Sequence, residues 1–258
     1  MRRKILVPMI VIATLVVLVA VPGVVLAVTF GGLEPRRDGA TLPGGVRVVS
    51  RGFVNAYILP AGEGAVALID CGAEVDARGI KAELARMGLD ERAVKAIFLT
   101  HGHLDHLGGC RQFPHARVHA FPEERVLIEG LEAAKGPVPR LRGAARELAT
   151  KLTDPLTDGQ VVQIGTLQVR AFHVPGHTAG SAAYLASGVL YLGDSVAVER
   201  EGQLRKAAWI FSDDQARSIE SVRRLAQRLK PEAAEVETLA CGHSGPSTGA
   251  SALFDFGP

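Results

Sequence analysis

The sequence predicts an α/β fold, in which short buried strands alternate with helices that lie on the outside. Runs of Val, Ile, Leu and Ala recur along the chain at strand length, with turn residues between them. Two longer segments instead place apolar residues at helical spacing. The 258 residues suffice for one large domain, and 47% hydrophobic but only 5% aromatic residues predict a mainly aliphatic core.

The N-terminal segment is expected to direct the protein to or across a membrane. A basic cluster at residues 2–4 precedes an uncharged run over 5–30, long enough for a helix to span the roughly 30 Å hydrocarbon core of a bilayer. The cluster predicts a cytoplasmic N-terminus. The run is either a membrane anchor helix or a signal peptide cleaved after small residues near 25–27. We therefore expect an extracytoplasmic domain that is either membrane-anchored or secreted to the periplasm.

Residues 31–45 are rich in Gly, Pro and charge and predict a linker, so the folded domain is expected over 46–258. The apolar runs within it show little polar alternation, which is typical of strands buried on both faces. Predicted strands lie at 46–50, 55–60, 65–72, 96–100, 116–121, 167–174, 188–195 and 236–243.

Two segments predict helices between these strands. Residues 76–87 carry apolar side chains at helical spacing and stop at Gly88, a residue typical of the position after a helix. Residues 213–229 repeat the pattern, and Ser212 with Gln215 three residues later predicts a capping box at the start.

Charge and cysteine content exclude some classes of protein. The net charge of +2, without a basic block in the main body, argues against a nucleic-acid-binding surface. The three cysteines, Cys71, Cys110 and Cys241, are widely spaced and odd in number, which predicts neither a disulfide framework nor a zinc knuckle. We interpret all three as buried packing residues. The sequence does not indicate an oligomeric state.

The stretch "THGHLDHLGG" at 100–109 concentrates metal-binding side chains after a predicted strand. His101 and His103 are two residues apart, so in an extended segment they project to the same side. Asp105 and His106 follow beyond a turn, where a helix can begin. Imidazole and carboxylate ligands suit zinc or iron and require no thiolate.

These four side chains cannot all reach one ion in a good tetrahedron, which suggests two ions with further ligands at other strand ends. Three candidates have that context. His177 lies in "HVPGHT", Asp194 in "YLGDS" and His243 in "ACGHSGP", each next to Gly and after a run of strand-forming residues.

The motifs "THGHLDHLGG", "PGHTAGS", "GDS" and "GHSGP" resemble those of the metallo-β-lactamase superfamily and follow that superfamily's order over residues 46–250. The resemblance implies a four-layer αββα sandwich, here preceded by the N-terminal hydrophobic segment, with a dinuclear metal site at one edge.

The resemblance also implies a division of ligands between two ions. One ion would be held by His101, His103 and His177, the other by Asp105, His106 and His243, with Asp194 bridging both. The motif "GDS", with its aspartate, resembles the motif of the glyoxalase II-like, lactonase and RNase Z branches of the superfamily. It therefore disfavours antibiotic hydrolysis as the activity.

These implications predict a hydrolase that uses two zinc ions and a bridging hydroxide to cleave a small ester, thioester or lactone. Iron or manganese are the alternative metals. Asp105 is the predicted catalytic residue, orienting the hydroxide and passing its proton to the leaving group. The alternatives are a mononuclear-iron persulfide dioxygenase and a non-catalytic, membrane-tethered metal-binding module. The expected partner is a small-molecule substrate, with a membrane contact if the N-terminal segment is uncleaved.

Supporting roles are predicted for residues near these motifs. Asp70, which ends a predicted strand, is the candidate to hold the second nitrogen of a ligand histidine. His173 is expected to make a structural hydrogen bond rather than to bind metal. Tyr184 and Tyr191 are expected to fill core positions. For Trp209 the sequence leaves open whether it packs or lines a substrate pocket.

Overall fold

The computed structural model describes residues 23–25 and 27–257. The predicted N-terminal helix over 1–30 falls mostly outside these residues. Among the helices that are described, none combines the length and apolarity that crossing a membrane requires. The chain divides into two compact units, residues 1–33 and 34–258, and all features below belong to the second.

One layer of this unit is a seven-stranded mixed sheet with its strands in sequence order. β1 to β4 pair antiparallel and β4 to β7 pair parallel. The strands are β1 (Thr41–Leu42), β2 (Val46–Arg51), β3 (Val54–Pro60), β4 (Val66–Ile69), β5 (Val94–Phe98), β6 (Arg117–Ala120) and β7 (Asp154–Pro155).

The other sheet has six strands in the order β15-β14-β11-β10-β9-β8, parallel between β11 and β14 and antiparallel elsewhere. Its strands are β8 (Val161–Ile164), β9 (Leu167–His173), β10 (Ala182–Ala186), β11 (Val189–Tyr191), β14 (Thr238–Ala240) and β15 (Ser247–Thr248). A separate two-stranded ribbon joins β12 (Val196–Val198) and β13 (Leu204–Lys206).

Helices cover the outer faces of the two sheets. The α-helices are α2 (Arg78–Arg86), α3 (Leu104–Leu107), α4 (Arg125–Ile128), α5 (Pro139–Arg142), α6 (Gln215–Leu229) and α7 (Ser251–Phe254). Short 3₁₀ helices are η1 (Pro43–Gly45), η2 (Glu91–Ala93), η3 (Cys110–Gln112), η4 (Pro122–Glu124), η5 (Arg146–Leu148), η6 (Trp209–Phe211) and η7 (Lys230–Glu235).

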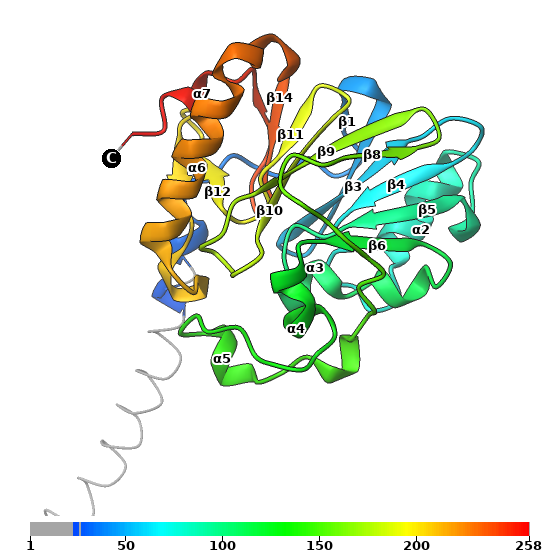
Figure 1. Cartoon of the computed structure of the whole chain (residues 1–258), viewed down its shortest axis with the longest axis horizontal. Helices are drawn as coiled ribbons and strands as arrows, with labels where there is room; N and C mark the ends of the chain where they lie inside the picture. The colour runs from blue at the N-terminus through cyan, green and yellow to red at the C-terminus, as the bar shows by residue number, and fades with distance from the viewer. Residues whose placement is uncertain (1–22, 26, 258) are drawn as a thin grey trace, which may run out of the picture. The chain divides into compact units, whose positions relative to one another are not determined.

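Three buried clusters define the layers. One joins the facing sides of both sheets, where Phe98 of β5 packs edge-on against Tyr184 of β10. A second places Leu84 of α2 against the outer side of the first sheet, and a third does the same for Val222 of α6 on the second sheet. Figure 1 shows α6 lying along the sheet that contains β10 and β11. The predicted αββα sandwich is therefore confirmed.

Most predicted elements are confirmed, and the differences have local causes. Each predicted strand overlaps an observed one, and Gly88 follows α2 with a positive φ of 73°. The central strand β10 was not predicted because its alanines carry a weak strand signal; it forms through pairing on both sides. The capping box was wrong: the Asp214 side chain accepts the N–H of Arg217 and caps α6.

The segment predicted as a linker contacts the folded unit from Glu34 onward. The compact unit begins at Glu34, whose backbone N–H donates to the carbonyl of Val198 at 2.8 Å. Strand β1, within the same stretch, pairs with β2. In this stretch Gly39, Gly44 and Gly45 have positive φ values, and Pro43 begins η1.

All three cysteines are buried, as expected, but the expectation that none of them forms a disulfide was wrong. Cys71 and Cys110 form a disulfide with a Cα–Cα distance of 5.3 Å, whereas Cys241 is free and fully buried, as expected. The disulfide partners are 39 residues apart in sequence. The pairing arises because β4 and the segment after α3 lie side by side, which spacing alone does not reveal.

Candidate metal centre

The seven predicted metal ligands lie together, each on a segment that follows a strand. His101 follows β5, His177 follows β9, Asp194 follows β11 and His243 follows β14. Asp105 and His106 lie in α3, which begins directly after the extended residue His103. Three overlapping groups have their ligand atoms within 4.8 Å of one another: His101, His103 and His177; His101, His106 and Asp194; Asp105, His106 and His243.

The first group is formed by three imidazoles whose nitrogens converge. His101 Nε2 lies 3.0 Å from His103 Nδ1, and His177 Nε2 lies 3.2 Å and 3.1 Å from these two atoms. Burial, together with neighbouring imidazoles, lowers the pKa of His103 to about 4 and the pKa values of His101 and His177 well below the ordinary histidine value. Neutral imidazoles whose lone pairs face one another favour a cation between them.

The second group, formed by Asp105, His106 and His243, combines one carboxylate with two imidazoles, and the carboxylate of Asp194 lies beside it. His243 Nε2 lies 2.8 Å from Asp194 Oδ2 and 3.4 Å from Asp105 Oδ2, while His106 Nε2 lies 3.4 Å from Asp194 Oδ1. Burial acts to lower the pKa of His106, but Asp194, Asp70 and Asp105 outweigh it and raise that pKa well above the ordinary value. This part of the centre therefore stabilises positive charge.

Asp194 lies between the two groups. Its Oδ2 atom is 3.9 Å from His101 Nε2 and 3.7 Å from His177 Nε2, in addition to its contact with His243. Burial acts to raise the pKa of Asp194, but the neighbouring His243 and His106 lower it well below the ordinary value, so the side chain is a carboxylate. A single anionic side chain thus faces both groups.

Buried polar atoms at the centre have no hydrogen-bond partner among the described residues. They include His106 Nε2 and Asp194 Oδ1, which face one another across the second group. Buried polar side-chain atoms normally have a partner. The donor set and these unpartnered atoms fit bound metal.

The outer nitrogens of four ligand histidines have hydrogen-bond partners, which fix the tautomers. His106 Nδ1–H donates to Asp70 Oδ2 at 2.7 Å, and His243 Nδ1–H donates to the Phe53 carbonyl at 2.7 Å. His177 Nδ1 lies 3.1 Å from Ser212 Oγ, which itself donates to the Ala208 carbonyl and so accepts from the ring.

His101 is held in the same way through Thr100. Thr100 Oγ1 donates to Asp70 Oδ2 at 2.7 Å and lies 3.1 Å from His101 Nδ1, so it accepts the proton of that nitrogen. In all four rings the Nε2 atom therefore faces the centre. His103 differs, because Nδ1 faces the centre and the buried Nε2 has no partner in the described part of the chain.

Asp70 has the supporting role that the sequence predicted. Its carboxylate accepts bonds from the backbone and hydroxyl of Thr100 and from His106, with no direct place in the ligand groups. His173 makes the predicted structural hydrogen bond, from Nε2–H to the Ala179 carbonyl at 3.1 Å. Tyr184 and Tyr191 are fully buried in the core between the sheets, as expected.

Sequence reasoning missed two supporting residues, Ser212 and Glu124. Ser212 was assigned to a helix cap but holds His177. Glu124 is a fully buried acid that contacts the segments of His101 and His177. A glutamate in a charged, irregular stretch carries no local signal for burial.

Two large apolar side chains near the ligands are exposed. Phe53, at the turn between β2 and β3, is 50% exposed and stacks on His243 with ring centroids 5.7 Å apart. Trp209, three residues before Ser212, is 63% exposed. The open question about Trp209 is thus answered in part, since it does not pack in the core.

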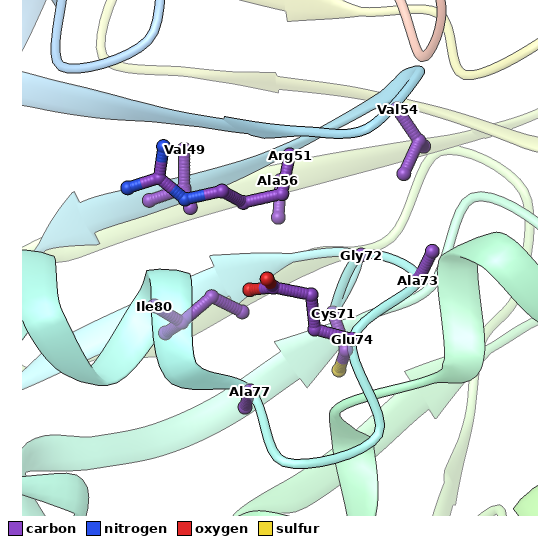
Figure 2. A pocket seen from close by; sticks show the side chains of 10 residues that line it. All are labelled: Val49, Arg51, Val54, Ala56, Cys71, Gly72, Ala73, Glu74, Ala77 and Ile80. Carbon is purple, nitrogen blue, oxygen red and sulfur yellow. The ribbon is translucent and has the colours of Figure 1, made fainter.

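A pocket lies on the α2 side of the first sheet, beside Cys71 rather than at the ligand groups (Figure 2). Figure 2 shows Arg51 of β2 on one wall and Glu74 on the other. Arg51 pairs with Asp38, and Glu74 accepts the N–H of Gly79 at 2.8 Å. The charged side chains of this pocket are therefore engaged within the protein.

Comparison with known proteins gives a consistent family. A family model described as the metallo-beta-lactamase superfamily matches residues 49–243. A hydroxyacylglutathione hydrolase of Vibrio cholerae serotype O1 is 32% identical over 125 residues, which are 48% of this chain and 42% of that protein. A Bacillus subtilis protein named a probable polyketide biosynthesis zinc-dependent hydrolase is 28% identical over 162 residues, 62% of each chain.

Solved structures share the fold. A B3 metallo-beta-lactamase with an active-site glutamic acid superposes with a TM-score of 0.64 at 22% identity, covering 90% of both chains. A metallo-beta-lactamase family protein from Thermus thermophilus has a TM-score of 0.59 at 26% identity, covering 83% of this chain and 76% of that one. The chain spans less than half the length of the Vibrio relative it matches.

Proposed function

The chain belongs to the metallo-beta-lactamase superfamily, and from this premise we propose that it is a hydrolase that holds two zinc ions and cleaves a small ester, thioester or lactone. One observation carries the proposal: two ligand groups share the carboxylate of Asp194. His101, His103 and His177 would hold one ion; Asp105, His106 and His243 would hold the other. Asp194 would contact both.

Zinc suits this donor set. The centre offers five imidazoles and two carboxylates and no thiolate, since the free Cys241 is buried outside the ligand groups. Iron and manganese remain the alternative metals that the same donors accept. The printed name of the Bacillus relative, a zinc-dependent hydrolase, supports zinc. When bound, two such ions supply Lewis acidity and lower the pKa of water toward about 7.

Asp105 is the proposed catalytic residue. It lies in the first turn of α3, and its side chain is 20% exposed, more than that of Asp194 at 10%. Its Oδ2 atom is 3.4 Å from His243 Nε2. From this position the carboxylate orients the attacking water, accepts its proton and donates it to the leaving group, worth roughly 10²–10⁴-fold in rate.

The substrate class rests on chemistry and on the relatives' names. Hydroxyacylglutathione hydrolases are named for cleavage of an acyl derivative, which supports an acyl substrate here. The exposed rings of Phe53 and Trp209, on segments that contact His243 and Ser212, offer apolar surface for such a substrate. A small molecule is therefore the proposed partner.

We also propose that the domain is extracytoplasmic. The basic cluster and apolar run at 2–30 motivate this placement. The disulfide between Cys71 and Cys110 supports it, because disulfides form and persist in oxidising compartments. Fractionation of cells that produce the full chain tests the placement; recovery of reduced, full-length protein from the cytosol would refute it.

The activity is tested by metal content and a substrate panel on the full chain. Elemental analysis of protein purified without added metal should give two zinc ions per chain. Esters, thioesters and lactones should include a substrate whose turnover falls by about 10²–10⁴-fold in Asp105→Ala. A single iron with no zinc would instead identify a mononuclear dioxygenase. Two bound metals without turnover of any panel member would indicate a binding module.

A further inference from the structure

Glu124 connects the two segments that carry the three-histidine group. It ends η4, the short helix after β6, and its side chain is fully buried. Its Oε2 atom accepts the N–H of Gly102 at 2.7 Å. Its Oε1 atom accepts the N–H of Gly180 at 2.7 Å and the hydroxyl of Thr178.

These donors adjoin the ligand histidines. Gly102 lies between His101 and His103, and Thr178 directly follows His177. The first segment follows β5 in the seven-stranded sheet, and the second joins β9 to β10 in the six-stranded sheet. One carboxylate therefore bridges two ligand segments that belong to different sheets.

Two glycines let the backbone around Glu124 approach both segments. A Cβ atom on Gly102 would lie 2.4 Å from Leu127 Cβ, and one on Gly180 would lie 2.7 Å from the Glu124 backbone nitrogen. Both distances are shorter than real Cβ contacts, so any side chain at either position would push the segments apart. The close contact therefore depends on the glycines in "HGH" and "HTAG".

We propose that Glu124 is a positioning residue that sets the spacing between His177 and the His101–His103 pair, an inference that rests on the proposed metal centre. The three inner nitrogens lie 3.0 Å to 3.2 Å apart. Their lone pairs repel one another before an ion is bound, so the segments need a separate attachment. Glu124 supplies it with three hydrogen bonds from outside the ligand groups, and thereby preorganises the group.

Glu83 provides a matched control. It is also a buried glutamate, 2% exposed, and its two oxygens accept bonds from Arg47 and Arg86 at 2.6 Å. It lies in α2, on the outer side of the first sheet, and is in none of the ligand groups. Loss of either carboxylate should lower stability, but only loss of Glu124 should change metal binding.

The experiment compares Glu124→Gln and Glu83→Gln with the wild-type full chain. Glutamine keeps the size of Glu124 but has one acceptor oxygen, so an NH₂ group faces the donor of one ligand segment. Each metal-free protein is titrated with zinc against a chelating indicator and with Co²⁺, whose visible absorption reports ligand geometry. For Glu124→Gln we expect roughly 10–100-fold weaker binding at one site and an altered Co²⁺ spectrum. For Glu83→Gln we expect wild-type values.

If Glu124→Gln does not fold, Thr178→Val tests the same positioning role. It removes one of the three donors and keeps the residue's size, so it should weaken zinc binding in the same direction by a smaller factor. Wild-type affinity and spectrum in the folded variants would overturn the inference, as would an equal loss in Glu83→Gln. If the wild-type chain itself bound no stoichiometric metal, the proposed function would fail instead.

Discussion

Replacing Asp70 with asparagine should weaken binding of the ion that we propose Asp105, His106 and His243 to hold. The Asp70 carboxylate accepts the Nδ1–H of His106 at 2.7 Å and the hydroxyl of Thr100 at 2.7 Å through one oxygen. The other oxygen accepts the Thr100 backbone N–H at 2.8 Å. Asparagine keeps the shape but offers one acceptor oxygen, so an NH₂ group faces a donor on His106 or on Thr100.

The magnitude follows from the bond that is lost. A hydrogen bond to a charged group contributes about 1.5–3 kcal/mol. Because about 1.4 kcal/mol corresponds to a factor of ten, zinc affinity at the second group should fall roughly 10–100-fold. His101 contacts Asp70 only through Thr100, so the three-histidine group should be affected less.

Competition with a chelator of known zinc affinity, near neutral pH, measures both sites in the metal-free protein. Asp154→Asn is the control, because Asp154 pairs with Arg117 and is in none of the ligand groups. It should bind zinc as the wild type does. Two zinc ions bound by Asp70→Asn with wild-type affinities would refute the reasoning.

Three further outcomes follow from other contacts. Cys110→Ala should lower the free energy of unfolding by about 4 kcal/mol, since the disulfide closes a loop of 39 residues. Urea unfolding measures this free energy. Equal stability of the oxidised wild type and the variant would contradict the prediction. Ser212→Ala removes the acceptor for His177 Nδ1–H and should weaken zinc binding at the three-histidine group by roughly 10-fold or more. An unchanged Co²⁺ spectrum and zinc affinity would show that Ser212 does not support His177. Burial raises the pKa of Glu124 from 4.5 to about 7, although its three hydrogen-bond donors act to lower it. Between pH 4.5 and about 7 the folded state therefore binds more protons than the unfolded state. The stability of the metal-free wild type should therefore fall by up to about 3 kcal/mol as pH rises from about 4.5 to about 7, relative to Glu124→Gln; a difference between the two proteins that stays constant with pH would count against this.

The sheets could be predicted where apolar residues recur along a strand. β3 is almost entirely buried, and β9 alternates apolar residues with Gln168 and Arg170; the predicted bounds of both match the observed ones to within a residue. Strand β10 was missed because its first two residues are alanines, which have a weak preference for strands. They form a strand here because β10 pairs with β9 and β11. The disulfide of Cys71 was missed for a similar reason, since it depends on the packing of α3 against β4 rather than on sequence spacing.

That the candidate ligand residues lie together could be predicted because each lies beside glycine or within the same short motif directly after a strand. The residues that hold them could be predicted only in part. Asp70 directly follows β4, which pairs with β5, the strand that precedes His101, so its position was visible in the sequence. Ser212 and Glu124 contact residues 35 and 54 positions away, and their local patterns, a helix cap and a charged stretch, indicated other roles.

The two ligand groups differ in charge, and this difference bears on which metals they accept. The three-histidine group contains neutral imidazoles and shares only Asp194. The second group has Asp105 as well as Asp194, and Asp70 accepts a hydrogen bond from His106 Nδ1. Carboxylate oxygens suit harder ions such as manganese, whereas imidazoles suit zinc. The second group should therefore be the less selective of the two, so substitution of zinc by manganese should begin there. All these residues can be identified in the sequence. The difference in charge between the two groups, however, arises only in the fold, where β4 of one sheet and β11 of the other bring Asp70 and Asp194 to opposite sides of His106.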